Sequence, residues 1–215
     1  MTDTIRHHLT DDLLMAYSTG ELPEAFSLVV ATHVSLCDEC RARLGSFDAV
    51  GGEVLEAMQG ATVTESSFEA TLARITGQPV GDQRPIRAKG IFPSPLQDYV
   101  GGDLSAVKWK SVGMGVKQAI LPVASGATVR LLHIPAGGAM PDHGHKGREM
   151  TLVLQGAFSD ADGRYARGDV EIADDDVQHT PVAEAGQDCI CLAATEAPLR
   201  FRSLLPRLVQ PFFKI

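Results

Sequence analysis

The stretch 137–156 places three metal-ligand side chains at even spacing between two flanking glycines. Residues at even spacing in a β-strand project to the same face of the strand, so their side chains can converge on one cation. The ligand residues in this stretch are His143, His145 and Glu149. His179 follows a short distance downstream and can supply a fourth ligand. The stretch therefore predicts a β-hairpin that carries a metal site.

A second group of ligand residues, His33, Cys37 and Cys40, lies more than 100 residues earlier. At the spacing of an α-helix the three lie on one face. One imidazole and two thiolates suit the tetrahedral N/S coordination of zinc, and the fourth ligand is expected from His7 or His8. One alternative is that the cysteines are a redox pair, although no βαβ pattern surrounds them. The other is that they are plain helix residues. We favour zinc, because a metal would also stabilise a small helical unit with a thin core.

The first 76 residues have the pattern of helices. Helices are expected over 10–19, 23–44 and 65–76. Thr10 is expected to cap the first of them. The second stretch is expected to break near Leu36, so that Cys37 begins a further helix that runs to about Gly51.

Residues 77–95 hold glycine, proline and charged residues without apolar periodicity, which is typical of a linker. After them, short β-rich runs alternate with glycine, proline and aspartate, which favours an antiparallel barrel or jelly roll. The expected organisation is a helical domain over 1–76, a linker over 77–95, a β domain over 96–200 and a C-terminal segment over 201–215.

The composition is that of a globular chain, since 44% of its 215 residues are hydrophobic. The sequence has no run of 18 apolar residues and no apolar signal region at its N-terminus, so neither a membrane span nor export is expected. A cytoplasmic location is the expectation, and its four cysteines then argue against a disulfide framework.

Cys189 and Cys191 form the second cysteine pair. They stand two residues apart in an apparent strand, so their side chains share a face. We interpret them as small apolar residues of a core. The alternative is a redox pair, which would need exposure and a lowered thiol pKa.

The net charge of −8 is divided unevenly along the chain. Residues 1–90 hold 13 acidic and 7 basic side chains, whereas residues 91–215 hold 14 and 12. Direct binding of nucleic acid requires a basic surface, so it is not expected. The acidic N-terminal part suits a basic protein partner, or is simply a solvated acidic surface.

The residues from His7 to Gly52 read HHLTDDLLMAYSTGELPEAFSLVVATHVSLCDECRARLGSFDAVGG. This stretch resembles the zinc-binding anti-sigma domain, and the resemblance is closest to the ChrR-type anti-sigma factors, which join this domain to a cupin. The resemblance implies a zinc site made by four residues: His8, His33, Cys37 and Cys40. His7 remains a substitute for His8, since the two are adjacent.

The stretch 137–156 resembles the first cupin motif. The second motif is partly present, because Gly168 and His179 stand at matching positions. The Pro, Gly and Asn that the family usually shows are replaced by Asp174, Asp176 and Ala183. The turn is therefore altered, but the fourth ligand is retained. The resemblance implies a metal bound by four side chains: His143, His145, Glu149 and His179.

Three imidazoles and one carboxylate suit Zn(II), Fe(II), Mn(II), Ni(II) or Cu(II), and we favour zinc. The expected fold is therefore a two-domain α plus β chain. Its N-terminal part is an all-α zinc-binding domain, and its C-terminal part is a cupin, an antiparallel β jelly-roll barrel.

The resemblance implies an anti-sigma factor rather than an enzyme. Such a protein would bind an extracytoplasmic-function (group IV) sigma factor as a 1:1 heterodimer, without contacting nucleic acid or a membrane. It would block transcription until the cupin responds to singlet oxygen or an organic hydroperoxide. The alternative is a metal-dependent cupin enzyme, such as a dioxygenase, with an accessory zinc domain.

Overall fold

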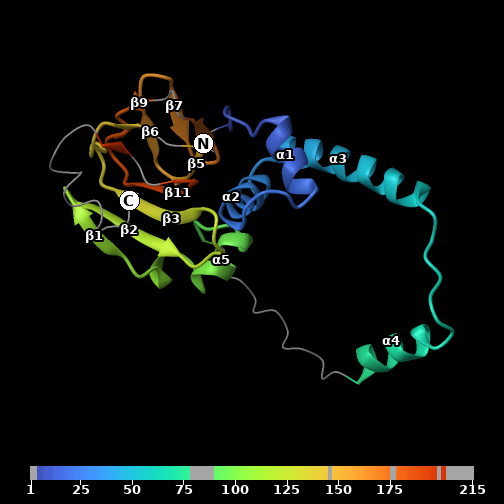
Figure 1. Ribbon diagram of the computed structural model, residues 1–215. Coiled ribbons are helices and arrows are strands. Elements are labelled where there is room, and N and C mark those ends of the chain that lie inside the picture. The colour runs from blue at the N-terminus through green and yellow to red at the C-terminus, as the bar shows by residue number, and fades with distance from the viewer. Residues whose placement is uncertain (1–3, 78–89, 145–146, 175–177, 198–199, 202–215) are drawn as a thin grey trace.

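The computed structural model describes residues 4–77, 90–144, 147–174, 178–197 and 200–201 (Figure 1). For residues 143, 178, 200 and 201 it describes the backbone alone. The middle of the expected linker, at 78–89, and nearly all of the expected C-terminal segment lie outside the described residues.

The described helices before residue 78 are α1 (Asp11–Ser18), α2 (Glu24–Val34), α3 (Asp38–Ala57) and α4 (Ser67–Thr76). All of them carry an acidic side chain in the first turn, where the helix dipole stabilises negative charge. The predicted break near Leu36 is confirmed, and Cys37 caps α3 by accepting the backbone N–H of Cys40 at 3.4 Å. Helix α3 continues past its expected end near Gly51 to Ala57.

The β part begins with α5 (Ser94–Val100) and the short 3-10 helix η1 (Leu104–Ala106). The strands are β1 (Lys110–Gly113), β2 (Val116–Leu121), β3 (Thr128–Ile134), β4 (His143–Gly144), β5 (Glu149–Gln155), β6 (Ala157–Ser159), β7 (Arg164–Ala166), β8 (Val170–Ala173), β9 (Gln178–His179), β10 (Val182–Ala183), β11 (Cys189–Thr195) and β12 (Arg200–Phe201). One sheet has the order β1-β2-β3-β11-β5-β8, and two smaller ones have the orders β10-β6-β7 and β12-β4-β9. All of these pairs are antiparallel.

Strand β11 is buried along its whole length because both faces of the large sheet are covered. Its Ile190 and Leu192 belong to a core that also contains residues of the helices. Its Cys189 and Cys191 belong to a second core, with Val153 and other side chains between the sheets. Alternate residues of one strand therefore serve two different cores.

Helix α2 lies against the large sheet, where it packs on β5 and β11 (Figure 1). Leu28 and Val29 of this helix are in the same core as Leu152 and Leu192 of the sheet. The predicted α plus β architecture is confirmed. Its helical part and its β part also share one hydrophobic core.

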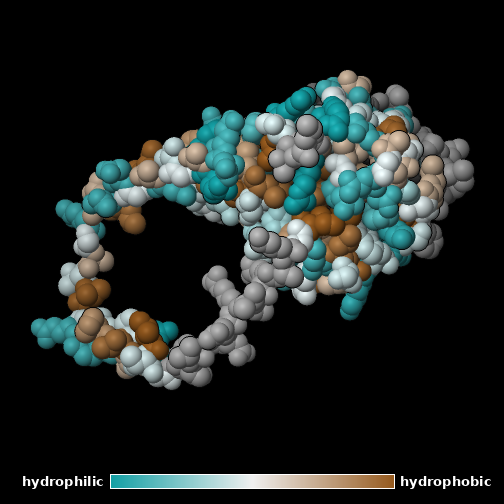
Figure 2. Space-filling view, turned by 180° about the vertical axis from the view of Figure 1, so that it is seen from behind, coloured by the Kyte–Doolittle hydropathy of each residue, from teal (hydrophilic) through white to brown (hydrophobic). Residues whose placement is uncertain are grey.

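Helices α3 and α4 reach away from this core, and α4 stands apart from the rest of the described chain (Figure 1). Figure 2 shows apolar side chains on the surface of the same arm. Within the described ranges, no helix has both the length and the apolar character that crossing a membrane requires.

Candidate metal centres

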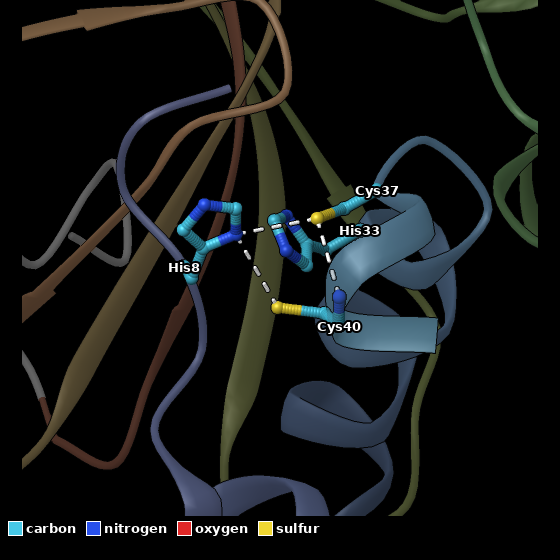
Figure 3. A group of neighbouring side chains, drawn as sticks. All are labelled: His8, His33, Cys37 and Cys40. Atoms are coloured by element: carbon cyan, nitrogen blue, oxygen red, sulfur yellow. Dashed lines mark hydrogen bonds between the residues drawn. The ribbon is translucent and has the colours of Figure 1, made fainter. Parts of the chain in front are cut away.

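Four side chains of the helical part meet at one point (Figure 3). His8 comes from the segment before α1, and His33 from the last turn of α2. Cys37 and Cys40 stand at the start of α3. One ligand atom from each of the four lies within 4.8 Å of the others. The short connection from α2 to α3 thus presents one imidazole and two sulfurs together, and the N-terminal segment adds the second imidazole.

The ring of His8 is held between the sulfurs and a carboxylate. Its Nδ1 lies 3.3 Å from Sγ of Cys37 and 3.6 Å from Sγ of Cys40. Its Nε2 lies 3.5 Å from Oε2 of Glu39. A carboxylate on the outward nitrogen of an imidazole is the usual way to orient a histidine toward a metal.

The ring of His33 is buried and uses only one nitrogen in a hydrogen bond. Its Nδ1 lies 2.9 Å from the carbonyl oxygen of Gly168, to which it donates. Its Nε2 has no hydrogen-bond partner within the described part of the chain. Burial lowers the pKa of His33 to about 4, so the ring is neutral and Nε2 carries a lone pair. A buried lone pair without a donor beside two sulfurs fits a bound metal ion.

The thiol of Cys40 needs a cation to become a ligand. Burial raises the pKa of Cys40 to about 11 when no metal is bound, and the nearby Cys37 adds to this. A soft cation would displace the thiol proton and relieve this cost, so metal binding and folding are coupled here. Two sulfurs and two imidazole nitrogens match the tetrahedral set that zinc prefers.

His7 lies elsewhere. Its ring packs on the ring of Tyr165 with the centroids 4.3 Å apart. Of the two adjacent histidines, it is His8 that faces the cysteines in this structure.

The four cupin candidates are described to different degrees. His145 lies outside the described residues, and only the backbone of His143 is described. That backbone pairs with His179 across β4 and β9. Glu149 begins β5, is buried, and accepts a hydrogen bond from the Thr151 hydroxyl at 3.1 Å. Glu149 and His179 line one pocket, so the described candidates do face the same space.

Two further acidic residues contact His179. Its Nδ1 lies 2.8 Å from Oδ2 of Asp160 and 2.9 Å from Oε1 of Glu171. Burial alone would lower the pKa of His179, but the hydrogen bond and charge of Glu171 and the hydrogen bond to Asp160 raise it to about 9. Burial raises the pKa of Glu171 to about 7. The three ligand atoms are close enough to hold a cation, and without one they form an ion pair.

The pocket between the sheets is lined by both apolar and polar side chains. The polar and sulfur-bearing residues at its wall are Arg130, Met140, Glu149, Thr151, Glu171, His179, Cys191 and Thr195. The sulfurs of Cys189 and Cys191 lie 3.5 Å apart and are buried. The hydrogen bond to Cys189 and burial raise the pKa of Cys191 well above that of a free thiol. The Cys191 thiol is therefore protonated, and both cysteines are buried, as expected of core residues.

Comparison with known proteins identifies the β part and the whole chain. Residues 97–198 match the family described as the ChrR cupin-like domain. Over 215 residues the chain is 59% identical to the anti-sigma-E factor ChrR of Cereibacter sphaeroides, covering 99% of this chain and all of that protein. The chain belongs to the ChrR family of anti-sigma factors.

A solved structure supports the same assignment. The crystal structure of Rhodobacter sphaeroides SigE in complex with the anti-sigma factor ChrR contains a chain that is 56% identical to this one. The match has a TM-score of 0.79 and covers 89% of this chain and 99% of that chain. The predicted ChrR-type resemblance and the cupin fold are confirmed.

In this ChrR-family chain, sequence reasoning missed Asp160 and Glu171. Glu171 stands in a short strand among apolar residues, and an acidic side chain at a buried strand position is a usable signal. Asp160 follows β6 in the sequence SDADG, which reads as a turn and gives no hint of an inward carboxylate.

Proposed function

We propose that this chain is a regulatory anti-sigma factor, without enzymatic activity, that binds an extracytoplasmic-function sigma factor one to one. The observation that carries the proposal is the 59% identity over nearly the full length to an anti-sigma-E factor. A second support is the likeness to a chain crystallised with SigE. The sigma factor is then kept from RNA polymerase, which also implies a cytoplasmic location. These likenesses favour regulation over the alternative of a cupin enzyme.

The helical arm offers a surface that suits such a partner. Phe68, Leu72 and Ile75 of α4 recur at helical spacing and are 72%, 47% and 68% exposed. Residues three and four apart lie on one helix face, so these side chains form an apolar stripe. An exposed apolar stripe on a helix is a common way to engage a groove of another protein. Helix α3 also exposes apolar residues, namely Val50, Val54 and Leu55, with Met58 just beyond the helix.

The N-terminal metal site is proposed to be a structural zinc site. His8, His33, Cys37 and Cys40 would hold the ion, and zinc would fasten the start of α3 to the end of α2. This fastening matters for the partner, because α3 carries part of the exposed apolar surface.

A cysteine substitution tests the zinc site. We expect Cys37→Ser to lose the zinc and to weaken sigma binding, because metal-binding energy is folding energy in a closed structural site. Metal analysis and a binding assay with R. sphaeroides SigE measure the two effects. A Cys37→Ser protein that keeps both its full zinc content and its SigE affinity would contradict the assignment.

The cupin is proposed to receive the signal, singlet oxygen or an organic hydroperoxide. His143, His145, Glu149 and His179 are proposed as ligands of a divalent metal there, and zinc is the metal that we favour. Support comes from Glu149 and His179, which face one pocket. An ion held there would face this pocket and could meet a small oxidant. Cys191 lines the same pocket, but its raised pKa keeps the thiol protonated and so less reactive.

Reconstitution tests the function as a whole. The purified chain is mixed with R. sphaeroides SigE, and the mass of the complex is measured by light scattering. Transcription by RNA polymerase with SigE is measured with and without the chain. We expect a 1:1 complex and loss of SigE-dependent transcripts. Full transcription with a saturating amount of the folded chain would refute the proposal.

A further inference from the structure

The segment that carries His8 lies along a turn of the cupin. Oδ1 of Asp169 accepts the backbone N–H groups of Arg6 at 2.6 Å and His7 at 2.9 Å. The N–H of Val170 donates to the carbonyl of His7 at 3.1 Å. Asp169 is only 2% exposed, so water competes little for these hydrogen bonds.

The same turn contacts a second candidate ligand. The Nδ1–H of His33 donates to the carbonyl of Gly168, which is 135 residues further along the chain. This hydrogen bond sets the tautomer and the rotation of the ring, and so aims Nε2 at the cysteines. Consecutive residues of the cupin thus orient one ligand of the proposed zinc site, His33, and hold the backbone of the segment that carries a second ligand, His8.

The close approach is built into the turn. Gly168 has a φ of +94°, and a Cβ at this position would lie 2.6 Å from Cδ1 of Ile5. A larger residue would therefore be strained by this φ, and the side chain of Ile5 would have to move to make room for it. Oδ2 of Asp169 accepts the N–H of Ala166 at 2.8 Å. One carboxylate closes the turn and holds the segment at the same time.

We propose that the cupin turn Gly168–Val170 is a positioning partner of the N-terminal metal site and sets how long that site retains its metal. The inference rests on the proposed function in one respect, namely that the four ligands hold zinc. If the turn is disrupted, His33 loses its orienting carbonyl and the segment before α1 loses its backbone partners. Two cysteines on α3 then remain as the firmly placed ligands. Loss of such an outer partner typically weakens metal binding by about 10-fold to 100-fold.

Full-length variants test this inference. Asp169→Ala removes the carboxylate, and Asp169→Asn keeps one oxygen that can accept from Arg6 and His7. The matched control is Glu24→Gln. Glu24 also joins a helix to the cupin, through Tyr99 and Ala124, each at 2.6 Å, but at the opposite end of α2 from His33.

Two measurements report how the metal is bound, independently of whether the protein is folded. The first is the rate at which zinc passes from the protein to a colorimetric chelator. The second is the thiolate-to-metal absorption band of the cobalt(II) form, which reports the cysteine-bearing site and not a cupin site made of nitrogen and oxygen ligands. Circular dichroism verifies that each variant is folded.

We expect Asp169→Ala to release zinc about 10-fold to 100-fold faster than wild type and to change the cobalt band. The zinc release rate of Asp169→Asn should lie between those of wild type and Asp169→Ala, and the rate of Glu24→Gln should match wild type. Equal release from wild type and from both folded Asp169 variants would overturn the inference while leaving the zinc site in place. Release from Glu24→Gln as fast as from Asp169→Ala would also overturn the inference. In that case any weakening of the contact between the helical part and the cupin would speed zinc release. A wild-type protein without the thiolate band would refute the zinc site itself.

Discussion

At the scale of single residues, His33 divides its two nitrogens between two parts of the molecule. Nδ1 donates a hydrogen bond to the carbonyl of Gly168 in the cupin, and Nε2 faces the cysteines at the start of α3. Burial keeps the ring neutral, which suits a ligand that must not carry a second proton. His8 also divides its nitrogens, because Nε2 contacts the carboxylate of Glu39 and Nδ1 faces the cysteines.

Tyr99 and Glu24 give a prediction about pH. The hydrogen bond from Tyr99 to Glu24 raises the pKa of Tyr99 to about 12. A raised pKa of an acid means that the folded state holds the proton more firmly than the unfolded state. The stability from this contact is therefore present below pH 10, and it is lost as the pH rises through about 12.

The measurement is an ultraviolet titration of tyrosine ionisation. Burial raises the pKa of Tyr165 to about 12 as well, so two of the three tyrosines should ionise late in wild type. In Glu24→Gln we expect one of these two to ionise earlier, while the Tyr165 step stays in place. An unchanged curve for Glu24→Gln would contradict the role of the hydrogen bond.

At the scale of elements, the sequence predicted what local chemistry decides. The break near Leu36 and the start of α3 at Cys37 follow from a cap, which neighbouring residues determine. The even spacing of His143, His145 and Glu149 predicted one β-hairpin, but this is wrong, because β4 pairs with β9 and β5 pairs with β8 and β11. The shared metal site of these residues with His179 stays a prediction. The end of α3 was missed, because Gly51 and Gly52 lower helix propensity without forbidding a helix.

The docking of the two parts could not be predicted from the sequence. It depends on a backbone carbonyl at Gly168 and on backbone N–H groups at Arg6 and His7, and such groups leave no residue-type signal. The burial of α2 by the cupin sheet was likewise not predicted.

Helix α4 gives a prediction about the partner. We expect Leu72→Ala and Phe68→Ala each to weaken binding to R. sphaeroides SigE by about 1 kcal/mol or more, as truncations of buried apolar anchors do. Their side chains are exposed in the free chain, so the melting temperature should change little. Calorimetric titration measures the affinity, with Thr71→Ala on the same helix as the control. Wild-type affinity in both variants would exclude α4 from the interface.

Removal of the N-terminal metal gives a prediction about local order. Helix α2 packs on β5 and β11, so its amide protons should stay protected after chelation. The first turns of α3 should lose protection, because the ion would tie Cys37 and Cys40 to His33 of α2. Hydrogen exchange with mass spectrometry, before and after EDTA, measures both regions. Uniform loss of protection through α2 would mean that the helical part unfolds as one unit.

At the scale of the whole molecule, the two candidate metal centres are joined by one short strand. Strand β8 begins at Val170, directly after the turn that holds His7 and His33. One residue further on, Glu171 bonds to His179. A shift of β8 would therefore change the positions of residues at the proposed zinc site and at the cupin pocket together.

This arrangement leads to a prediction about signalling. His179→Ala removes the partner of Glu171 and a proposed cupin ligand, but it leaves the turn at Gly168 and the helical arm intact. We therefore expect His179→Ala cells to keep the sigma factor inhibited and to lose induction by singlet oxygen. Asp169→Ala loosens the other end of the same strand, so we expect it to raise reporter expression without any signal.

A sigma-dependent reporter in cells measures both effects, and Cys189→Ser/Cys191→Ser is the comparison. Both thiols are buried, and the raised pKa of Cys191 keeps that thiol protonated, so the double variant should respond nearly as wild type does. Normal induction in His179→Ala with none in the double cysteine variant would move the sensing role to the thiols. Normal induction in both His179→Ala and the double cysteine variant would mean that the pocket does not sense the signal. Because β8 contacts both candidate centres, the Asp169→Ala result then decides whether the cupin acts on the helical arm through this strand.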